Sequence, residues 1–312
     1  MSIKILQPGL FSTVQDLGRI GYEHIGFSGA GAMDQFSFKV AQSLINNDGP
    51  AIEYTLIGPT IQFNTQNTFV ITGGSINASL NNKTISMNSV ILAEKGDILK
   101  IGAITKGVRG YLTFGHSINV PSIAESYATH TRSSIGGFKG RKLLANDVIT
   151  VKINNDFKEN IGKTIHLQDD LLPENNIIHI LQGPQFEAFS EEARAKIVNH
   201  PYLITEQSDR MGYRLEGDSV APINQADIIS EPVALGSVQV PNDGQPIILL
   251  NDKQTIGGYT KIATVCKFDL PKLAQMKPKD TIQFKWISFQ EAVDKNREQM
   301  SLFNEILKSH QK

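Results

Sequence analysis

The chain has little cysteine and no long hydrophobic run, and both shortages restrict what it can be. Cys266 is its only cysteine, so a disulfide within the chain and a cysteine-based metal cluster are excluded. It lies in the apolar run 263–266, which indicates a buried, inert thiol. No window approaches the roughly 20 apolar residues of a membrane span, and no secretory signal follows Met1. We therefore expect a cytoplasmic protein that does not enter a membrane.

The chain also lacks an excess of positive charge. Lysine and arginine total 30, aspartate and glutamate total 31, and the formal net charge is −1. Because binding to a phosphate backbone requires a positive excess, we expect no nucleic-acid partner. Its 40% hydrophobic and 20% charged residues are enough for a packed core and a solvated surface. A length of 312 residues suits two domains.

Three common site motifs are missing as well. The seven histidines form no His-x-x-x-His pair, so we predict no metal site. The stretch closest to a phosphate-binding loop, 136–142, lacks its spacing and its hydroxyl, which excludes nucleotide binding on such a loop. A Gly-x-Ser-x-Gly nucleophile elbow is absent.

What the chain does have is a series of short β-branched and aromatic runs separated by turn residues. This spacing predicts a mainly β protein built of barrels or sandwiches. The runs are 68–72, 84–87, 148–151, 247–250 and 281–284. Helices are few: apolar residues at helical spacing predict one over 33–44 and another over 186–197. Ser288 and Glu291 form a capping box that begins a C-terminal helix.

The two halves of the chain resemble each other in four short stretches that occur in the same order. The pairs are 6–9 with 181–184, 15–22 with 207–213, 73–74 with 257–258, and 92–98 with 273–282. Such an internal repeat predicts two related domains. We place an N-terminal β-barrel domain with a hairpin insertion at 1–155 and a C-terminal β-barrel domain with a terminal helix at 176–312. The polar stretches 154–160 and 173–176 are the predicted linker.

Candidate functional residues lie on polar, glycine-rich loops. The first loop carries Gln15, Asp16 and Arg19, and a second carries Asp34 at the start of the first helix. Exposed N–H groups at a helix start can hold an anion. Alternatively, Asp34 only starts the helix and the glycines only form turns, and the sequence leaves both interpretations open.

The second half carries two further loops of this kind. On the first, Asp209 and Arg210 could be an ion pair, or Arg210 and Arg214 could clamp a carboxylate or phosphate with their forked donors. The other joins Gln239 to the stretch 251–259, where unlike polar groups sit beside two glycines that let a ligand approach the backbone.

Taken together, these loops resemble the C subunit family of prokaryotic ATP-dependent 5-oxoprolinase. The same family includes allophanate-hydrolase subunit 2 and the biotin-dependent carboxyltransferase domain of urea amidolyase. The resemblance runs from about Ile3 to about Trp286. It implies a mainly β fold of tandem cyclophilin-like β-barrel domains with a few short helices and a C-terminal helix. It also implies a stable complex with the 5-oxoprolinase B subunit, and a further protein, the A subunit, which completes the enzyme.

The resemblance implies an activity too, the hydrolysis of 5-oxo-L-proline to L-glutamate, with ATP and Mg²⁺ bound at the level of the complex. Phosphorylation of the lactam oxygen would turn it into a leaving group. We assign catalysis to Asp252, Asp209 and Tyr259. The substrate-binding candidates are Gln15, Asp16, Arg19, Asp34, Arg210, Arg214, Gln239, Gln254, Thr255, Gly257 and Gly258. No metal ligands are assigned within this chain.

Two features depart from the family pattern or bear on the alternatives. Tyr127 stands where the family often has an arginine, which leaves the substrate open. Only Gln275-Met276-Lys277-Pro278 approaches a biotinylation motif, and its proline argues against biotin on this chain. One alternative is therefore a carboxyltransferase that acts on a urea-like amide with a separate biotin carrier. The other is a regulatory antagonist that binds a kinase inhibitor related to the B subunit.

Overall fold

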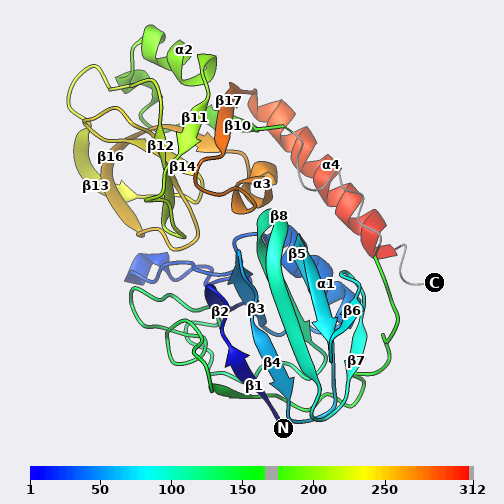
Figure 1. Ribbon diagram of the computed structural model, residues 1–312. Coiled ribbons are helices and arrows are strands. Elements are labelled where there is room, and N and C mark those ends of the chain that lie inside the picture. The colour runs from blue at the N-terminus through cyan, green and yellow to red at the C-terminus, as the bar shows by residue number, and fades with distance from the viewer. Residues whose placement is uncertain (166–174, 309–312) are drawn as a thin grey trace. The chain divides into compact units, whose positions relative to one another are not determined.

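The protein is mainly β, with 38% of residues in strands and 18% in helices. The computed structural model describes residues 1–165 and 175–308 (Figure 1). The mainly β prediction and the C-terminal helix are confirmed. No described helix is long and apolar enough to cross a membrane.

The described residues form two compact units. The first contains residues 1–19, 30–165 and 302–308, and the second contains 20–29 and 175–301. The predicted domain ranges, 1–155 and 176–312, stay a prediction, because contacts within the whole chain do not show which piece folds alone. Part of the predicted linker packs onto the first unit: the Phe157 carbonyl accepts a hydrogen bond from Thr68, and its ring lies 4.1 Å from that of His116. Pro173 and Glu174 lie outside the described residues.

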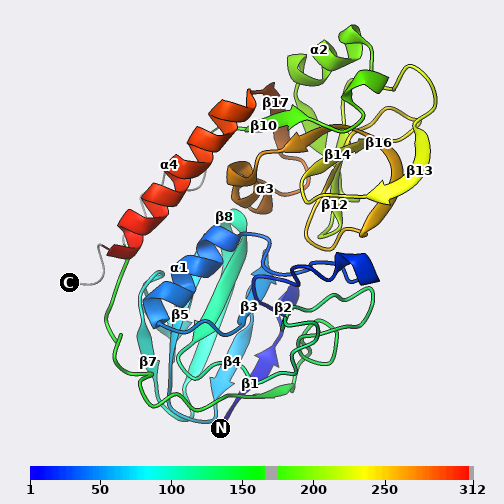
Figure 2. The same ribbon diagram turned by 180° about the vertical axis from the view of Figure 1, so that it is seen from behind.

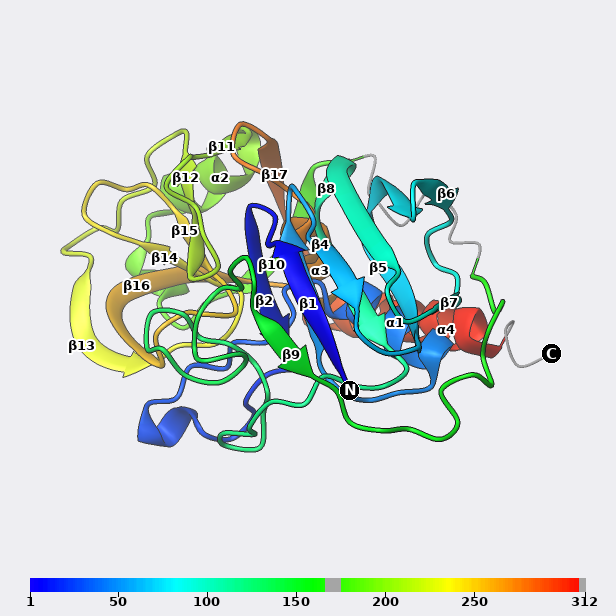
Figure 3. The same ribbon diagram turned by 60° about the horizontal axis from the view of Figure 1, so that its bottom comes forward.

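The first unit is built on a curled half-barrel sheet of nine antiparallel strands. The order is β2-β3-β8-β4-β1-β9, and β5 pairs with β8, β6 and β7. Figure 3 shows β9 beside β1 at one edge. The strands are β1 (Ser2–Gln7), β2 (Phe11–Gln15), β3 (Ala51–Thr55), β4 (Thr60–Phe63), β5 (Asn67–Leu80), β6 (Lys83–Ile85), β7 (Ile91–Ala93), β8 (Ile98–Phe114) and β9 (Val148–Thr150).

Packing on both faces stabilises this sheet. Phe63 and Phe69 lie in the core of the curl, with their ring centroids 5.5 Å apart. Figure 2 shows helix α1 (Gln35–Ile45) on the other face of the sheet. Its Val40 and Leu44 pack in one cluster with Val70 of β5. The helix begins two residues after its predicted start, because Asp34 is its N-cap.

The second unit is a closed barrel of seven strands, as the barrel prediction requires. The order β10-β17-β11-β12-β15-β14-β16 closes through the pairing of β10 with β16, and β13 pairs with β16 outside the ring. The strands are β10 (Ile177–Gln182), β11 (Tyr202–Ile204), β12 (Gly212–Glu216), β13 (Asp227–Pro232), β14 (Ser237–Val240), β15 (Ile247–Leu249), β16 (Ile256–Val265) and β17 (Thr281–Trp286).

Short helices complete the second unit. They are α2 (Glu191–Asn199), α3 (Leu270–Ala274) and the 3-10 helices η1 (Glu23–Ile25), η3 (Phe186–Ala188) and η4 (Lys267–Asp269). The predicted helix over 186–197 is thus two helices, because Ser190 caps α2 and interrupts the run. Helix α4 (Phe289–Lys308) begins at the predicted capping box. The backbone N–H of Ser288 donates to the Glu291 carboxylate, and the backbone N–H of Glu291 donates to the Ser288 hydroxyl. Cys266 is buried, which raises the pKa of its thiol to about 11.

Candidate active site on the closed barrel

Two adjacent strands of the barrel bury polar side chains. Gln239 on β14 stands opposite Lys261 on β16, and the two residues are only 2% and 1% exposed. Burying an amide and an ammonium group costs free energy unless each finds a partner. Their partners therefore show what the site is built for.

Lys261 is fixed by a framework of three neighbours. Its Nζ lies 2.7 Å from Oε1 of Glu231 and donates to the carbonyl of Tyr259 at 3.2 Å. Gln185 donates from Nε2 to the same Oε1 at 2.8 Å, and its own Oε1 accepts from the backbone N–H of Lys261. The hydrogen bond from Lys261 lowers the pKa of Glu231, so this carboxylate stays ionised.

Gln239 differs from its neighbours. Among the described residues, its buried Nε2 has no hydrogen-bond partner. It packs over the bare Cα of Gly257, where an added Cβ would lie 2.6 Å from Nε2. The amide nitrogen of the exposed Gln254 lies 3.4 Å from that same point. An unused buried donor costs about 1–3 kcal/mol, so a ligand oxygen at this position would recover that free energy.

We call Gln185, Glu231, Gln239, Gly257 and Lys261 the polar strand cluster. It is supplied by β13, β14, β16 and the turn after β10, which Figure 1 shows on one barrel. The loop patterns in the sequence indicated Gln239 and Gly257 but not the other three. The lysine stands in an apolar strand, where a buried cation is rare unless it is paired, and that was the available signal.

The loop that leads into β16 is held by a buried ion pair. Asp252 is 6% exposed, and it accepts from Nε and Nη2 of Arg210 at 3.0 and 2.9 Å. The backbone N–H of Asp252 also donates to the carbonyl of Arg210. Arg210 thus directs its fork at a carboxylate of its own chain, whereas Arg214 on β12 is exposed.

Lys253 follows this pair and is 8% exposed. Burial lowers the pKa of its ammonium group, and the charge of Glu23 partly opposes that shift. Ser28 donates from Oγ to the carbonyls of Lys253 and Asn251, at 2.9 and 3.3 Å. A lysine with a lowered pKa on a polar loop is a candidate proton carrier. It lies in the stretch 251–259 that the sequence indicated, although it was not among the assigned site residues.

The other candidates of the second half lie around these groups. Asp209 is exposed and its Oδ1 accepts from the backbone N–H of Met211 at 2.8 Å, which is the geometry of a turn. Tyr259 is 37% exposed. Gly258 lies on β16, and the carbonyl of Thr255 accepts from Val233. Their predicted roles stay predictions.

Two candidate site residues of the first unit, Gln15 and Asp34, make hydrogen bonds within that unit. Gln15 is buried and donates to Thr13 and to the carbonyl of Thr129, while its Oε1 accepts from Gly31. Asp34 accepts from the backbone N–H and the hydroxyl of Ser37, at 3.0 and 2.6 Å. These contacts support the interpretation in which Asp34 starts the helix.

Asp16 and Arg19 hold the loop 123–128. Asp16 accepts from Gly18 at 2.8 Å, from the hydroxyl of Ser126 at 2.7 Å and from the N–H of Tyr127 at 2.6 Å. Arg19 is 2% exposed and donates to carbonyls of that loop at 3.2 and 2.6 Å. Both residues stabilise the loop that carries Tyr127.

Comparisons with known proteins agree with the resemblance. The model of the family "Carboxyltransferase domain, subdomain A and B" matches residues 25–286. The 5-oxoprolinase C subunit of Escherichia coli (strain K12) is 33% identical over 307 residues, which cover 97% of each chain. The protein of that name from Haemophilus influenzae is 34% identical over 306 residues, again 97% of each.

A solved structure shows the same architecture. The crystal structure of the K. lactis urea amidolyase superimposes with a TM-score of 0.87 at 29% identity, over 98% of this chain and 20% of that one. The family predicted from the loops is thereby confirmed. This chain belongs to the carboxyltransferase domain family, subdomains A and B.

Proposed function

We propose that this chain is the C subunit of an ATP-dependent 5-oxoprolinase, which cleaves 5-oxo-L-proline to L-glutamate in the cytoplasm together with the A and B subunits. One observation carries the proposal: the match to proteins named as the C subunit of 5-oxoprolinase spans 97% of both chains. The match to the urea amidolyase structure, in contrast, covers only 20% of that chain.

The polar strand cluster suits a lactam substrate. A lactam carbonyl is a hydrogen-bond acceptor, and Nε2 of Gln239 is a buried donor that has no acceptor among the described side chains. In the proposal, Gln239 donates to the lactam oxygen once Gln254 moves aside, and the missing side chain of Gly257 lets the Gln239 amide pack directly against the backbone of β16. A preorganised donor stabilises charge that develops on that oxygen during ring opening.

The remaining groups have positioning or proton-transfer roles in this proposal. The pair of Lys261 and Glu231 fixes β16 against β13, so the donor of Gln239 is held in place. Lys253 is assigned proton transfer, because it lies buried on the polar loop before β16 and burial lowers the pKa of its ammonium group. We assign Asp252 a positioning role, since both of its oxygens accept from Arg210.

ATP and Mg²⁺ belong to the complex in this proposal. The described residues contain no group of three or more His, Cys, Asp or Glu side chains that could hold a metal ion. In this proposal the ATP and Mg²⁺ sites are completed at the level of the complex with the A and B subunits.

The test is ATP hydrolysis that depends on 5-oxoproline, measured with this chain and its two partner proteins. We expect activity only when all three proteins are present. Unchanged activity in a mixture of the A and B subunits without this chain would remove the chain from the reaction and overturn the proposal.

A carboxyltransferase acting on a urea-like amide is the second candidate, and the fold shared with the urea amidolyase favours it. The same donor of Gln239 would then hold the amide carbonyl. Lys277 is paired with Asp280 at 3.8 Å in the turn before β17, so biotin would come from a separate carrier. Transfer of the carboxyl group from a carrier that bears carboxybiotin to urea, without turnover of 5-oxoproline, would favour this candidate.

A further inference from the structure

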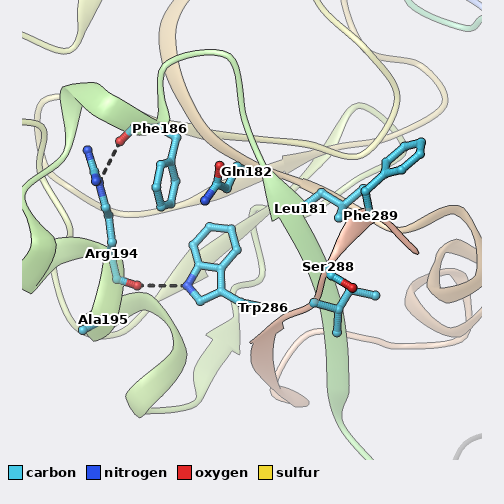
Figure 4. A pocket seen from close by; sticks show the side chains of 9 residues that line it. Leu181, Gln182, Phe186, Arg194, Ala195, Trp286, Ser288 and Phe289 are labelled. Carbon is cyan, nitrogen blue, oxygen red and sulfur yellow. Dashed lines mark hydrogen bonds between the residues drawn. The ribbon is translucent and has the colours of Figure 1, made fainter. Parts of the chain in front are cut away.

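A pocket of about 620 Å³ lies on the second unit, where β10 and β17 end and α4 begins (Figure 4). None of its lining residues belongs to the polar strand cluster. The volume lies within the range of about 300–1,000 Å³ that small-molecule sites occupy. Several lining residues, among them Gln182, Ala195 and Phe289, are exposed, so solvent reaches the pocket.

Aromatic rings form one wall. Phe186 and Trp286 meet edge to face with their centroids 5.3 Å apart. Trp286 is held by a hydrogen bond of 3.0 Å from Nε1 to the carbonyl of Arg194, which Figure 4 shows as a dashed line. The ring of Phe289 adds apolar surface from the start of α4 and is 74% exposed. Because the planes of Phe186 and Trp286 are 87° apart, a flat ring would stack on one of them and meet the other edge to face.

The pocket carries little net charge. The guanidinium of Arg194 lies 4.3 Å from the centroid of Phe186, and its Nε donates to the carbonyl of Phe186. Its Nη2 pairs with the carboxylate of Glu187. This arginine supports the ring and is balanced by an acid, so the pocket suits an uncharged ligand better than an anion.

One polar group reaches the wall without a partner. The side chain of Gln182 lies beside the rings of Phe186 and Trp286 in Figure 4. It is exposed, and its amide makes no hydrogen bond within the described part of the chain. A carboxamide offers a donor beside an acceptor, which matches the edge of a nucleobase.

We propose that this pocket binds an uncharged, planar heteroaromatic ring of the nucleobase class. The ring stacks on the wall of Phe186 and Trp286, and Gln182 pairs with its edge. The proposal does not depend on the proposed function, because no residue of the pocket takes part in it.

The chain supplies its own probe, since Trp286 is its only tryptophan. Titration with adenosine should change the tryptophan emission saturably, with a dissociation constant on the order of 0.1 mM. ATP should bind no more tightly than adenosine, because the wall lacks an uncompensated cation. Benzyl alcohol, which has a ring but no base edge, should bind at least tenfold more weakly, in line with a lost hydrogen-bonded pair.

Two variants test the residues. Gln182→Leu should weaken adenosine binding about tenfold and leave benzyl alcohol unaffected or tighter. It should fold, because the amide it removes is exposed. Phe186→Leu should weaken both ligands, and Gln66→Leu in the first unit is the control that should change neither. Emission that does not respond to adenosine overturns the proposal, as does equal binding of adenosine by Gln182→Leu. A response only to a partner protein would make the pocket a protein-docking site and would overturn it too.

Discussion

The two halves of the chain carry polar loops that look alike in sequence, yet they use them differently. Asp16 in the first half and Asp209 in the second each accept a hydrogen bond of 2.8 Å from the backbone N–H two residues further on. The repeated motif is therefore a repeated turn. Buried side-chain groups without a hydrogen-bond partner among the described residues occur in both halves, at Tyr54 and Thr113 in the first and at Thr205 and Gln239 in the second, and of these only Gln239 is a candidate site residue.

The contrast is clearest for two buried glutamines. Gln15 makes three hydrogen bonds to its own unit, whereas Nε2 of Gln239 makes none within the described ranges. Both glutamines are buried and lie in strands, Gln15 in β2 and Gln239 in β14. Polar richness alone thus does not mark a site, and hydrogen bonding that is left incomplete is the better indicator.

The largest expected effect concerns Lys253. Lys253→Met should lower the turnover of the assembled enzyme about 10³-fold, as loss of a proton-transfer group does. Burial lowers the pKa of this lysine in the folded state. Between the folded and the unfolded pKa the unfolded chain therefore binds more protons than the folded one, so the stability of the wild type rises with pH there. The variant should lose this dependence and be more stable than wild type at neutral pH.

Turnover together with urea unfolding at pH values near neutrality and in the alkaline range would measure both effects. Lys152→Met in the first unit is a matched control, since that lysine is exposed and contacts only the ring and hydroxyl of Tyr127. A Lys253→Met enzyme with wild-type turnover would show that Lys253 carries no proton in the reaction.

The next prediction compares the two glutamines directly. Gln239→Leu should reduce turnover about 100-fold, as loss of a carbonyl-binding donor does. Its free energy of unfolding should stay equal or rise, because an unsatisfied donor is replaced by an apolar group. Gln15→Leu should behave in the opposite way, with a loss of about 2–3 kcal/mol of stability and normal turnover per folded molecule. Unfolding curves and turnover at matched folded concentration separate the two, and a reversed pattern would place the site in the first unit.

The sequence predicted the fold class well because it depends on local patterns. The β-branched runs and the capping box at Ser288 act over a few residues and formed as expected, and Asp34 is the N-cap of α1, which was one of the two interpretations that the sequence left open. The site was predicted only in part because it depends on contacts between distant strands. Glu231 and Lys261 are partners across β13 and β16, and nothing in either stretch alone indicates the pair.

The same reasoning explains why Arg210 was assigned to a ligand. A forked donor next to an aspartate suggests either an ion pair or an anion site, and its partner turned out to be Asp252, 42 residues away. The sequence shows that Arg210 can donate two parallel hydrogen bonds, but its partner depends on how the folded barrel places Asp252 beside it.

A smaller effect should separate the two similar turns. Asp16→Ala removes three hydrogen bonds, two of them to the loop 123–128, and should cost about 2–3 kcal/mol. Asp209→Ala removes the hydrogen bond from Met211 and the longer one from Gly212, both on an exposed turn, and should cost about 1 kcal/mol. Thermal unfolding of the two variants measures the difference. Equal costs would mean that the loop 123–128 does not depend on Asp16.

The smallest effect is an acid dependence at Glu231. The hydrogen bond from Lys261 lowers the pKa of this carboxyl in the folded state, so its contribution to stability is present above the unfolded pKa of about 4.3 and is lost as the pH falls through the folded value. Because the Glu231 side chain is 38% exposed, solvent screens the pair and the effect should be modest. Glu231→Gln should flatten the fall in stability below about pH 4, whereas Glu94→Gln, an exposed acid of the first unit, should leave it unchanged. If both variants lose stability in parallel with wild type on acidification, the pair does not hold β13 against β16, and the framework behind Gln239 must rest on backbone pairing alone.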